Sequence, residues 1–198
     1  MTNGLLFYWF AWILWIITTF FMKKIRKRTV LACWILSVLM CSNLYASFEN
    51  IQLSIAFIIL WLGALLFHAK LPHLVYHVFS SFTISIGYIA ILLWEQHTPV
   101  WMFLPRIILI PVISTMLIVI LVKGFHNRIV VGILGISSGE TIYSLLLSSY
   151  AIQETIGEMA FFDMTIITLL IIVSLEIIKI TKQKLLLFSK QLLRWQNE

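Results

Sequence analysis

Three charged residues, Arg106, Glu140 and Asp163, lie inside long apolar stretches of the chain. A charge within a membrane is costly, so such residues pair with one another or line paths for substrates, ions and protons. Arg106 and Asp163 are expected at a similar depth on the outer side of the midplane, and the long Arg106 side chain can reach toward the deeper Glu140. The three residues predict a charged cluster, which is either a structural ion pair or a transport or ligand site.

Small and hydroxyl residues accompany Glu140 on its expected helix. Gly132, Gly135 and Gly139 follow one face, and small residues let membrane helices approach closely. Hydroxyl side chains lie beside this stripe, so the helix is expected inside the bundle. The candidate intramembrane polar site therefore has five members: Arg106, Glu140, Asp163, Ser137 and Tyr143.

Two prolines, Pro105 and Pro111, interrupt the stretch that carries Arg106. Proline removes a backbone hydrogen bond and kinks a helix. A kink beside Arg106 would expose backbone near the charge, as in the discontinuous helices of transporters. A fixed bend without a functional role is the alternative.

Signals for catalysis and for metal binding are weak. Residues 135–139 read G-x-S-x-G, which hydrolases use at a strand-to-helix turn, but here the motif falls in the middle of an expected helix. No histidine lies deep in a later apolar stretch, and a serine without a base is a poor nucleophile. His73 and His77 have a spacing that suits a metal ion, but neither a glutamate between them nor a nearby cysteine completes a site. We expect no enzymatic activity, no metal site and no cofactor.

The composition indicates the surroundings of these residues. Of 198 residues, 61% are hydrophobic and only 11% are charged, whereas soluble chains are about 45–50% apolar and 25% charged. The apolar runs are continuous and do not alternate with a period of two, which argues against strands. We therefore predict an all-α, polytopic integral membrane protein.

Seven stretches approach the length of about 20 residues that a spanning helix needs. They form a predicted bundle over residues 1–178, and a basic amphipathic tail over residues 179–198 follows them. The expected spans are residues 4–22, 29–48, 51–67, 74–94, 100–122, 129–150 and 160–178.

The basic residues orient these spans. Cytoplasmic loops of membrane proteins are enriched in lysine and arginine. With the N-terminus outside and the C-terminus cytoplasmic, thirteen of the fourteen basic residues fall on the inner side, while Glu49, Glu95, Glu154 and Glu158 fall outside. The first stretch lacks a preceding charge and is followed by basic residues, so we interpret it as a retained helix and not a signal peptide.

This distribution also predicts partners. The net charge of +6 lies almost wholly beside the inner leaflet, which favours anionic lipids over nucleic acid. The tail is expected either to lie on the inner leaflet or to extend the last helix, and docking of an unidentified protein partner is an alternative. The residues expected to contact anionic lipids, besides the tail, are Lys23, Lys24, Arg26, Lys27 and Arg28.

One family shares these features. Residues 7–43 read FYWFAWILWIITTFFMKKIRKRTVLACWILSVLMCSN, with a tryptophan-rich first helix, a TTFFMKK turn and a Cys-Ser-Asn end, and residues 139–143 read G-E-x-x-Y. The chain resembles the YphA-type membrane proteins of spore-forming bacilli over most of its length. The resemblance implies a plasma membrane location in a Gram-positive-type cell, and it transfers no site residues.

Two functional classes follow from these observations. The first is a non-enzymatic integral membrane protein that acts as an accessory, scaffold or signalling component. It predicts a tight interior in which Arg106 is neutralised. The second is a small-solute or ion-coupled transporter, with a polar site between the spans 100–122, 129–150 and 160–178.

Overall fold

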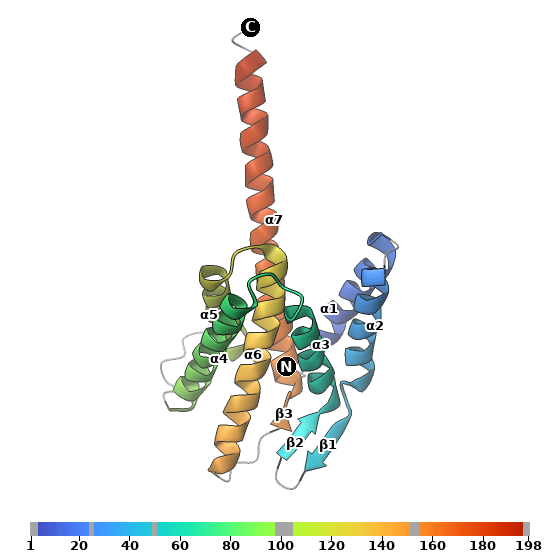
Figure 1. Ribbon diagram of the computed structural model, residues 1–198, viewed down its shortest axis with the longest axis vertical. Helices are drawn as coiled ribbons and strands as arrows, with labels where there is room; N and C mark the ends of the chain where they lie inside the picture. Colours follow the sequence, from blue (N-terminus) through green and yellow to red (C-terminus); the bar gives the residue numbers. More distant parts are fainter. Residues whose placement is uncertain (1–3, 24–25, 49–50, 98–104, 151–154, 196–198) are drawn as a thin grey trace.

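The computed structural model describes residues 4–23, 26–48, 51–97, 105–150 and 155–195, which form a helical bundle with a small sheet at one end (Figure 1). Lys24, Glu49, Glu154 and residues 100–104, all used in the predictions above, lie outside the described residues. The helices are α1 (Leu5–Ile16), the π-helix η1 (Ile17–Phe21) that continues it, α2 (Arg26–Cys41), α3 (Ile55–His68), α4 (Leu74–His97), α5 (Arg106–Leu121), α6 (Phe125–Ser149) and α7 (Met159–Trp195). The prediction of a mainly helical chain is confirmed.

Three helices are long and apolar enough to cross a membrane: Leu74–His97, Phe125–Ser149 and Met159–Leu186. At 1.5 Å per residue, the 25 residues of α6 extend about 37 Å, which exceeds the hydrocarbon thickness of about 30 Å. The shorter apolar helices are Leu5–Phe21, Ile55–His68 and Arg106–Leu121.

The expectation that strands are absent is wrong. Strands β1 (Tyr45–Phe48) and β2 (Ile51–Ser54) pair in antiparallel fashion, with Tyr45 opposite Ser54, and β3 (Thr155–Ile156) pairs in parallel with β2. The predicted spans 29–48 and 51–67 therefore end and begin in extended chain, because α2 stops at Cys41 and α3 starts at Ile55. Hydropathy alone does not distinguish a short apolar strand from a helical turn.

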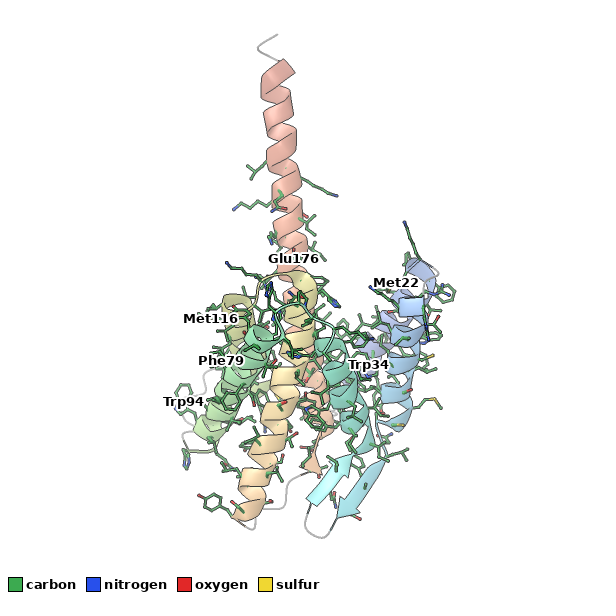
Figure 2. The ribbon with its side chains drawn as sticks, in the orientation of Figure 1. Met22, Trp34, Phe79, Trp94, Met116 and Glu176 are labelled. Carbon is green, nitrogen blue, oxygen red and sulfur yellow. The ribbon has the colours of Figure 1, made fainter. Side chains whose placement is uncertain are left out.

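Helix α6 occupies the middle of the bundle (Figure 1). Helices α4 and α5 lie on one side of it and α1, α2 and α3 on the other, while α4 makes the most extensive contact with α6. The core between them contains Ile84, Tyr88, Ile118 and Val131, each almost inaccessible to solvent. Figure 2 shows the labelled side chain of Trp34, whose indole Nε1 donates to the Ile59 carbonyl at 2.9 Å and joins α2 to α3.

Different structural elements lie at the two ends of the bundle. The sheet occupies one end, and the end of η1, the start of α2 and the α3–α4 and α5–α6 connections lie at the other (Figure 1). Helix α7 runs without a break for 37 residues, about 56 Å, and its C-terminal half projects beyond that second end. Of the two expectations for the tail, extension of the last helix is therefore the one that the structure shows.

The start of α5 also corrects a prediction. Pro105 precedes the helix at its N-cap position, so it does not kink the helix beside Arg106. A proline there is tolerated because the first turn has no intrahelical partner for its N–H. Pro111 does lie inside α5.

Candidate functional site

Gly135 and Gly139 of the predicted glycine stripe allow α6 to approach α4 closely. A Cβ atom on Gly135 would lie 2.8 Å from Ile84 and 2.9 Å from the Ser81 carbonyl oxygen. One on Gly139 would lie 2.9 Å from a ring carbon of Tyr88. All three distances are shorter than van der Waals contact, so only glycine allows the two backbones to approach this closely.

This approach brings Glu140 to Tyr88. The Tyr88 hydroxyl donates to Glu140 Oε2 at 2.8 Å, and the two residues are 1% and 9% exposed. A buried polar pair of this kind is stabilised when its hydrogen bonds are complete, and it is costly when one partner is lost. Tyr88 and Glu140 therefore form the polar centre of the contact between α4 and α6.

Other buried hydroxyl groups lie on α4, α5 and α6. Ser81 and Ser85 of α4 and Ser144 of α6 are each at most 6% exposed, and no hydrogen-bond partner satisfies their hydroxyl oxygens in the described structure. Ser114 and Thr115 of α5 are equally buried and also lack partners. The interfaces of α4, α5 and α6 are thus polar as well as closely packed.

Two predicted members of the site accompany Glu140 on α6. Tyr143 is 5% exposed and lies about one turn after Glu140. Ser137 is fully buried, and its hydroxyl donates to the Ile133 carbonyl of its own helix at 2.6 Å. This back-bonding occupies the hydroxyl proton.

Arg106 has a different partner from the one predicted. It is the first residue of α5, its side chain is half exposed, and its Nε lies 3.3 Å from Glu95 Oε2 at the end of α4. Glu95, which sequence reasoning assigned to an outer loop, therefore neutralises Arg106 at the rim of the bundle.

Asp163 contacts the start of α1 and not the other two charged residues of the predicted cluster. Its carboxylate accepts hydrogen bonds from the backbone N–H groups of Gly4 and Phe7, each at 2.7 Å, and it is 4% exposed. These donors belong to the first turn of α1, where a helix has unpaired N–H groups and favours negative charge. Asp163 thus caps α1 from α7, and in the described residues it forms no ion pair with Arg106.

The structure therefore divides the predicted cluster into three contacts and adds Tyr88, which is not among the predicted site residues. A signal for it existed. Ser81, Ser85 and Tyr88 share a face of α4 at intervals of four and three residues, and this face meets Gly135 and Gly139.

His73 and His77, the pair considered for a metal ion, lie at the opposite end of α4 from Glu95. His68 and His77 are both buried, and their ring centroids are 6.4 Å apart. In the described part of the chain, no three metal-binding side chains gather in one place.

Comparison with known proteins agrees with this membrane-type architecture. The family model of YphA-like integral membrane proteins matches residues 3–197. The chain belongs to the YphA-like integral membrane protein family. It is similar to a protein of Bacillus subtilis (strain 168) named "Uncharacterized protein YphA", with 24% identity over 159 residues, which cover 78% of this chain and 75% of that relative. No solved structure matches the chain. Membership of the YphA-like family makes this an integral membrane protein.

The Tyr88–Glu140 hydrogen bond gives a first prediction. Tyr88→Phe removes the donor and leaves the buried carboxyl group less satisfied, so we expect a loss of about 1–3 kcal/mol in the free energy of unfolding. Equilibrium unfolding in mixed detergent and SDS micelles measures it. In the double variant with Glu140→Gln, the two effects should be non-additive, because the residues share one interaction.

Tyr76→Phe is the matched control on the same helix. Its hydroxyl donates to the Leu121 carbonyl, but the residue is 53% exposed, so water can replace the bond and the loss should stay below about 1 kcal/mol. Equal losses for both variants, or simple additivity of Tyr88→Phe with Glu140→Gln, would contradict the assignment.

Proposed function

We propose that the protein crosses the plasma membrane seven times, with its N-terminus outside and its C-terminus in the cytoplasm. The ends of the helices alternate between the sheet end and the opposite end (Figure 1), as an up-and-down bundle requires. Glu95 and Glu158 lie toward the sheet end. The described basic residues at or beyond the other end include Lys23, Arg26, Lys27, Arg28, Lys70, Lys123, Arg128, Lys179, Lys182 and Lys184. This segregation supports the orientation.

Cysteine labelling tests the proposed topology. In a background with Cys33→Ser and Cys41→Ser, the substitution Gln52→Cys places a thiol in the sheet, and Lys184→Cys places one on the projecting part of α7. A membrane-impermeant maleimide should label Gln52→Cys in intact cells and Lys184→Cys only after lysis. The reverse pattern would refute the proposed orientation.

We propose further that the protein acts without catalysis, as a membrane-embedded scaffold or accessory component. The observation that carries this proposal is the projecting part of α7. Every described residue from Ile177 to Leu186 is exposed, including the apolar side chains of Ile180, Leu185 and Leu186. These apolar groups lie outside the packed bundle, and exposed apolar groups of this kind are typical of interaction surfaces.

The charges inside the bundle support the same proposal. Arg106 is paired with Glu95, Asp163 caps α1, and Glu140 accepts from Tyr88, so each has a structural partner. At the start of the projecting helix, Glu176 pairs with Arg128 at 3.8 Å and with Lys179 at 3.6 Å (Figure 2). The contact with Arg128 attaches the base of the helix to the start of α6.

Cross-linking tests the scaffold proposal. A photo-reactive amino acid at Gln183, which is exposed, should give one discrete protein adduct in membranes of the native type of cell. Leu185→Asp should abolish the adduct because it removes apolar contact area, whereas Lys182→Gln should preserve it. Adducts with phospholipid alone would instead place this helix against the membrane and refute the scaffold proposal.

A transporter is the second candidate, and the unsatisfied buried hydroxyl groups of α4, α5 and α6 favour it. In proteoliposomes that contain a pH-sensitive dye, the scaffold proposal expects proton flux no greater than in protein-free vesicles. Flux that exceeds this level, is lost in Glu140→Gln and persists in Glu95→Gln would favour transport.

We also propose that the basic residues contact anionic lipids of the inner leaflet. Lys179, Lys182 and Lys184 lie on the first two turns beyond Glu176, which corresponds to headgroup depth in the proposed orientation. Lys23, Arg26 and Lys27 are exposed at the same end.

A further inference from the structure

A groove lies between α2 and the end of the α1–η1 segment. Its volume is about 250 Å³. One part of its wall is apolar and the other part carries hydroxyl groups and one guanidinium group. The lining residues are Trp15, Thr19, Arg28, Thr29, Ala32, Cys33 and Leu36.

The polar end of the groove has unused binding capacity. Arg28 is half-buried, and its Nη1 donates to the Thr19 carbonyl at 3.2 Å. That carbonyl belongs to the last turn of η1, where a helix has unpaired acceptors. No acidic side chain in the described structure pairs with Arg28, and the buried Thr19 hydroxyl oxygen has no partner. A guanidinium group without an acidic partner, next to a hydroxyl group without a hydrogen-bond partner, is complementary to a phosphate.

The apolar end lies along the helix axes and away from this charge. Leu36 follows Arg28 by eight residues of α2, which places it about 12 Å further along the helix. Trp15 precedes Thr19 by four residues on the other wall. The groove therefore suits an elongated ligand with an anionic group at one end and a hydrocarbon chain at the other.

The depth of the groove matches such a ligand. Figure 2 shows Met22, just beyond η1, at the same end of the bundle as Glu176. This is the end with the exposed basic side chains of Lys23, Arg26 and Lys27. In the proposed orientation, the polar end of the groove lies at the headgroups of the inner leaflet and its apolar end lies among the acyl chains.

We propose that this groove binds one anionic glycerophospholipid of the inner leaflet. Its phosphate accepts hydrogen bonds from Arg28 and Thr19, and one acyl chain packs along Trp15, Ala32 and Leu36. The site differs from the diffuse attraction of a basic surface, because it has one guanidinium group in a fixed position and a shaped apolar wall. The assignment to the inner leaflet rests on the orientation in the proposed function.

Native mass spectrometry of the delipidated full chain in detergent tests the site. Titration with phosphatidylglycerol should give one bound lipid per chain, and phosphatidylcholine with the same acyl chains should bind about ten-fold more weakly. Arg28→Gln should weaken phosphatidylglycerol binding by about ten-fold, the value of one charge-assisted hydrogen bond, while Arg28→Lys should weaken it less. Ala32→Trp should weaken binding of both lipids, because its ring fills the apolar end.

Lys27→Gln is the matched control. It removes the same charge one position away, on an exposed side chain, and should weaken phosphatidylglycerol binding less than about three-fold. An equal effect of Lys27→Gln and Arg28→Gln would overturn the proposal in favour of diffuse attraction. Equal affinity for the two lipids, or displacement of phosphatidylglycerol by soluble glycerol 3-phosphate, would also overturn it.

Two further measurements separate folding and orientation from lipid binding. Thermal unfolding of each lipid-free variant shows whether it is folded, and Arg28→Lys retains the charge if Arg28→Gln is unstable. The titration in detergent does not depend on the orientation of the chain, so reversed cysteine labelling would overturn the inner leaflet assignment but not the groove.

Discussion

Replacing Gly135 with leucine is expected to separate α4 from α6 and to lower the free energy of unfolding by at least about 3 kcal/mol, the upper range for overpacking a core. Even the first added carbon would lie 2.8 Å from Ile84 and 2.9 Å from the Ser81 carbonyl oxygen. A backbone atom cannot rotate away as a side chain can, so α4 must shift as a whole. Unfolding in mixed detergent and SDS micelles, followed by far-ultraviolet circular dichroism, measures the loss.

Alanine substitutions at two glycines provide the control. At Gly87, also helical, an added Cβ would meet only a terminal methyl group of Leu117, at 2.5 Å, which can rotate away. The helix propensity of alanine, about 1 kcal/mol better than glycine, should therefore make Gly87→Ala neutral or stabilising. Gly135→Ala gains the same propensity but retains the backbone clash, so it should destabilise. The same sign for both variants would contradict the role assigned to Gly135.

The helical class and the glycine contact could be predicted because both depend on a single segment. A continuous apolar run indicates a helix, and the spacing of Gly132, Gly135 and Gly139 shows that they share one face. The pattern does not show which helix packs there. In the structure, the residues packed against these glycines include Ile84 and Tyr88 of α4 and Ile118 of α5.

The sheet could not be predicted from hydropathy because its strands are short and continue apolar helical stretches. β1 and β2 have four residues each, and β3 comes from a segment about a hundred residues later, where Leu53 pairs with Ile156. A strand of this length becomes stable only when its backbone hydrogen bonds are completed by partners. The parallel pairing of β2 with β3 therefore depends on the packing of the complete bundle.

The three charged residues inside apolar stretches could be identified from the sequence, but their partners could not. Charge and depth indicated Arg106, Glu140 and Asp163, but opposite charges at similar depth do not establish contact. Arg106 pairs with the nearer Glu95 at the rim, where both side chains retain partial contact with solvent. Such a pair costs less desolvation than one buried beside Glu140.

Asp163→Ala is expected to release the start of α1 and to lower the free energy of unfolding by about 3 kcal/mol, because two charge-assisted hydrogen bonds are lost together. The partners of Asp163 are the backbone N–H groups of Gly4 and Phe7, and main-chain partners leave no signal in residue types. This explains why charge pairing was inferred for a residue that caps a helix. Hydrogen exchange should accelerate at the Phe7 amide, whose protection depends on the carboxylate.

Two variants distinguish capping from a general effect of a core substitution. Asp163→Asn retains one acceptor oxygen and should lose about half as much stability. Thr165→Val changes a buried residue two positions later, whose hydroxyl only donates to the Phe161 carbonyl of its own helix, and should cost less than about 1 kcal/mol. If Asp163→Ala left exchange at Phe7 unchanged, the carboxylate would not be what holds α1 against α7. We therefore expect the loss in the free energy of unfolding to be largest for Asp163→Ala, smaller for Asp163→Asn and smallest for Thr165→Val. The differences between these losses measure how much of the α1–α7 contact depends on the Asp163 cap.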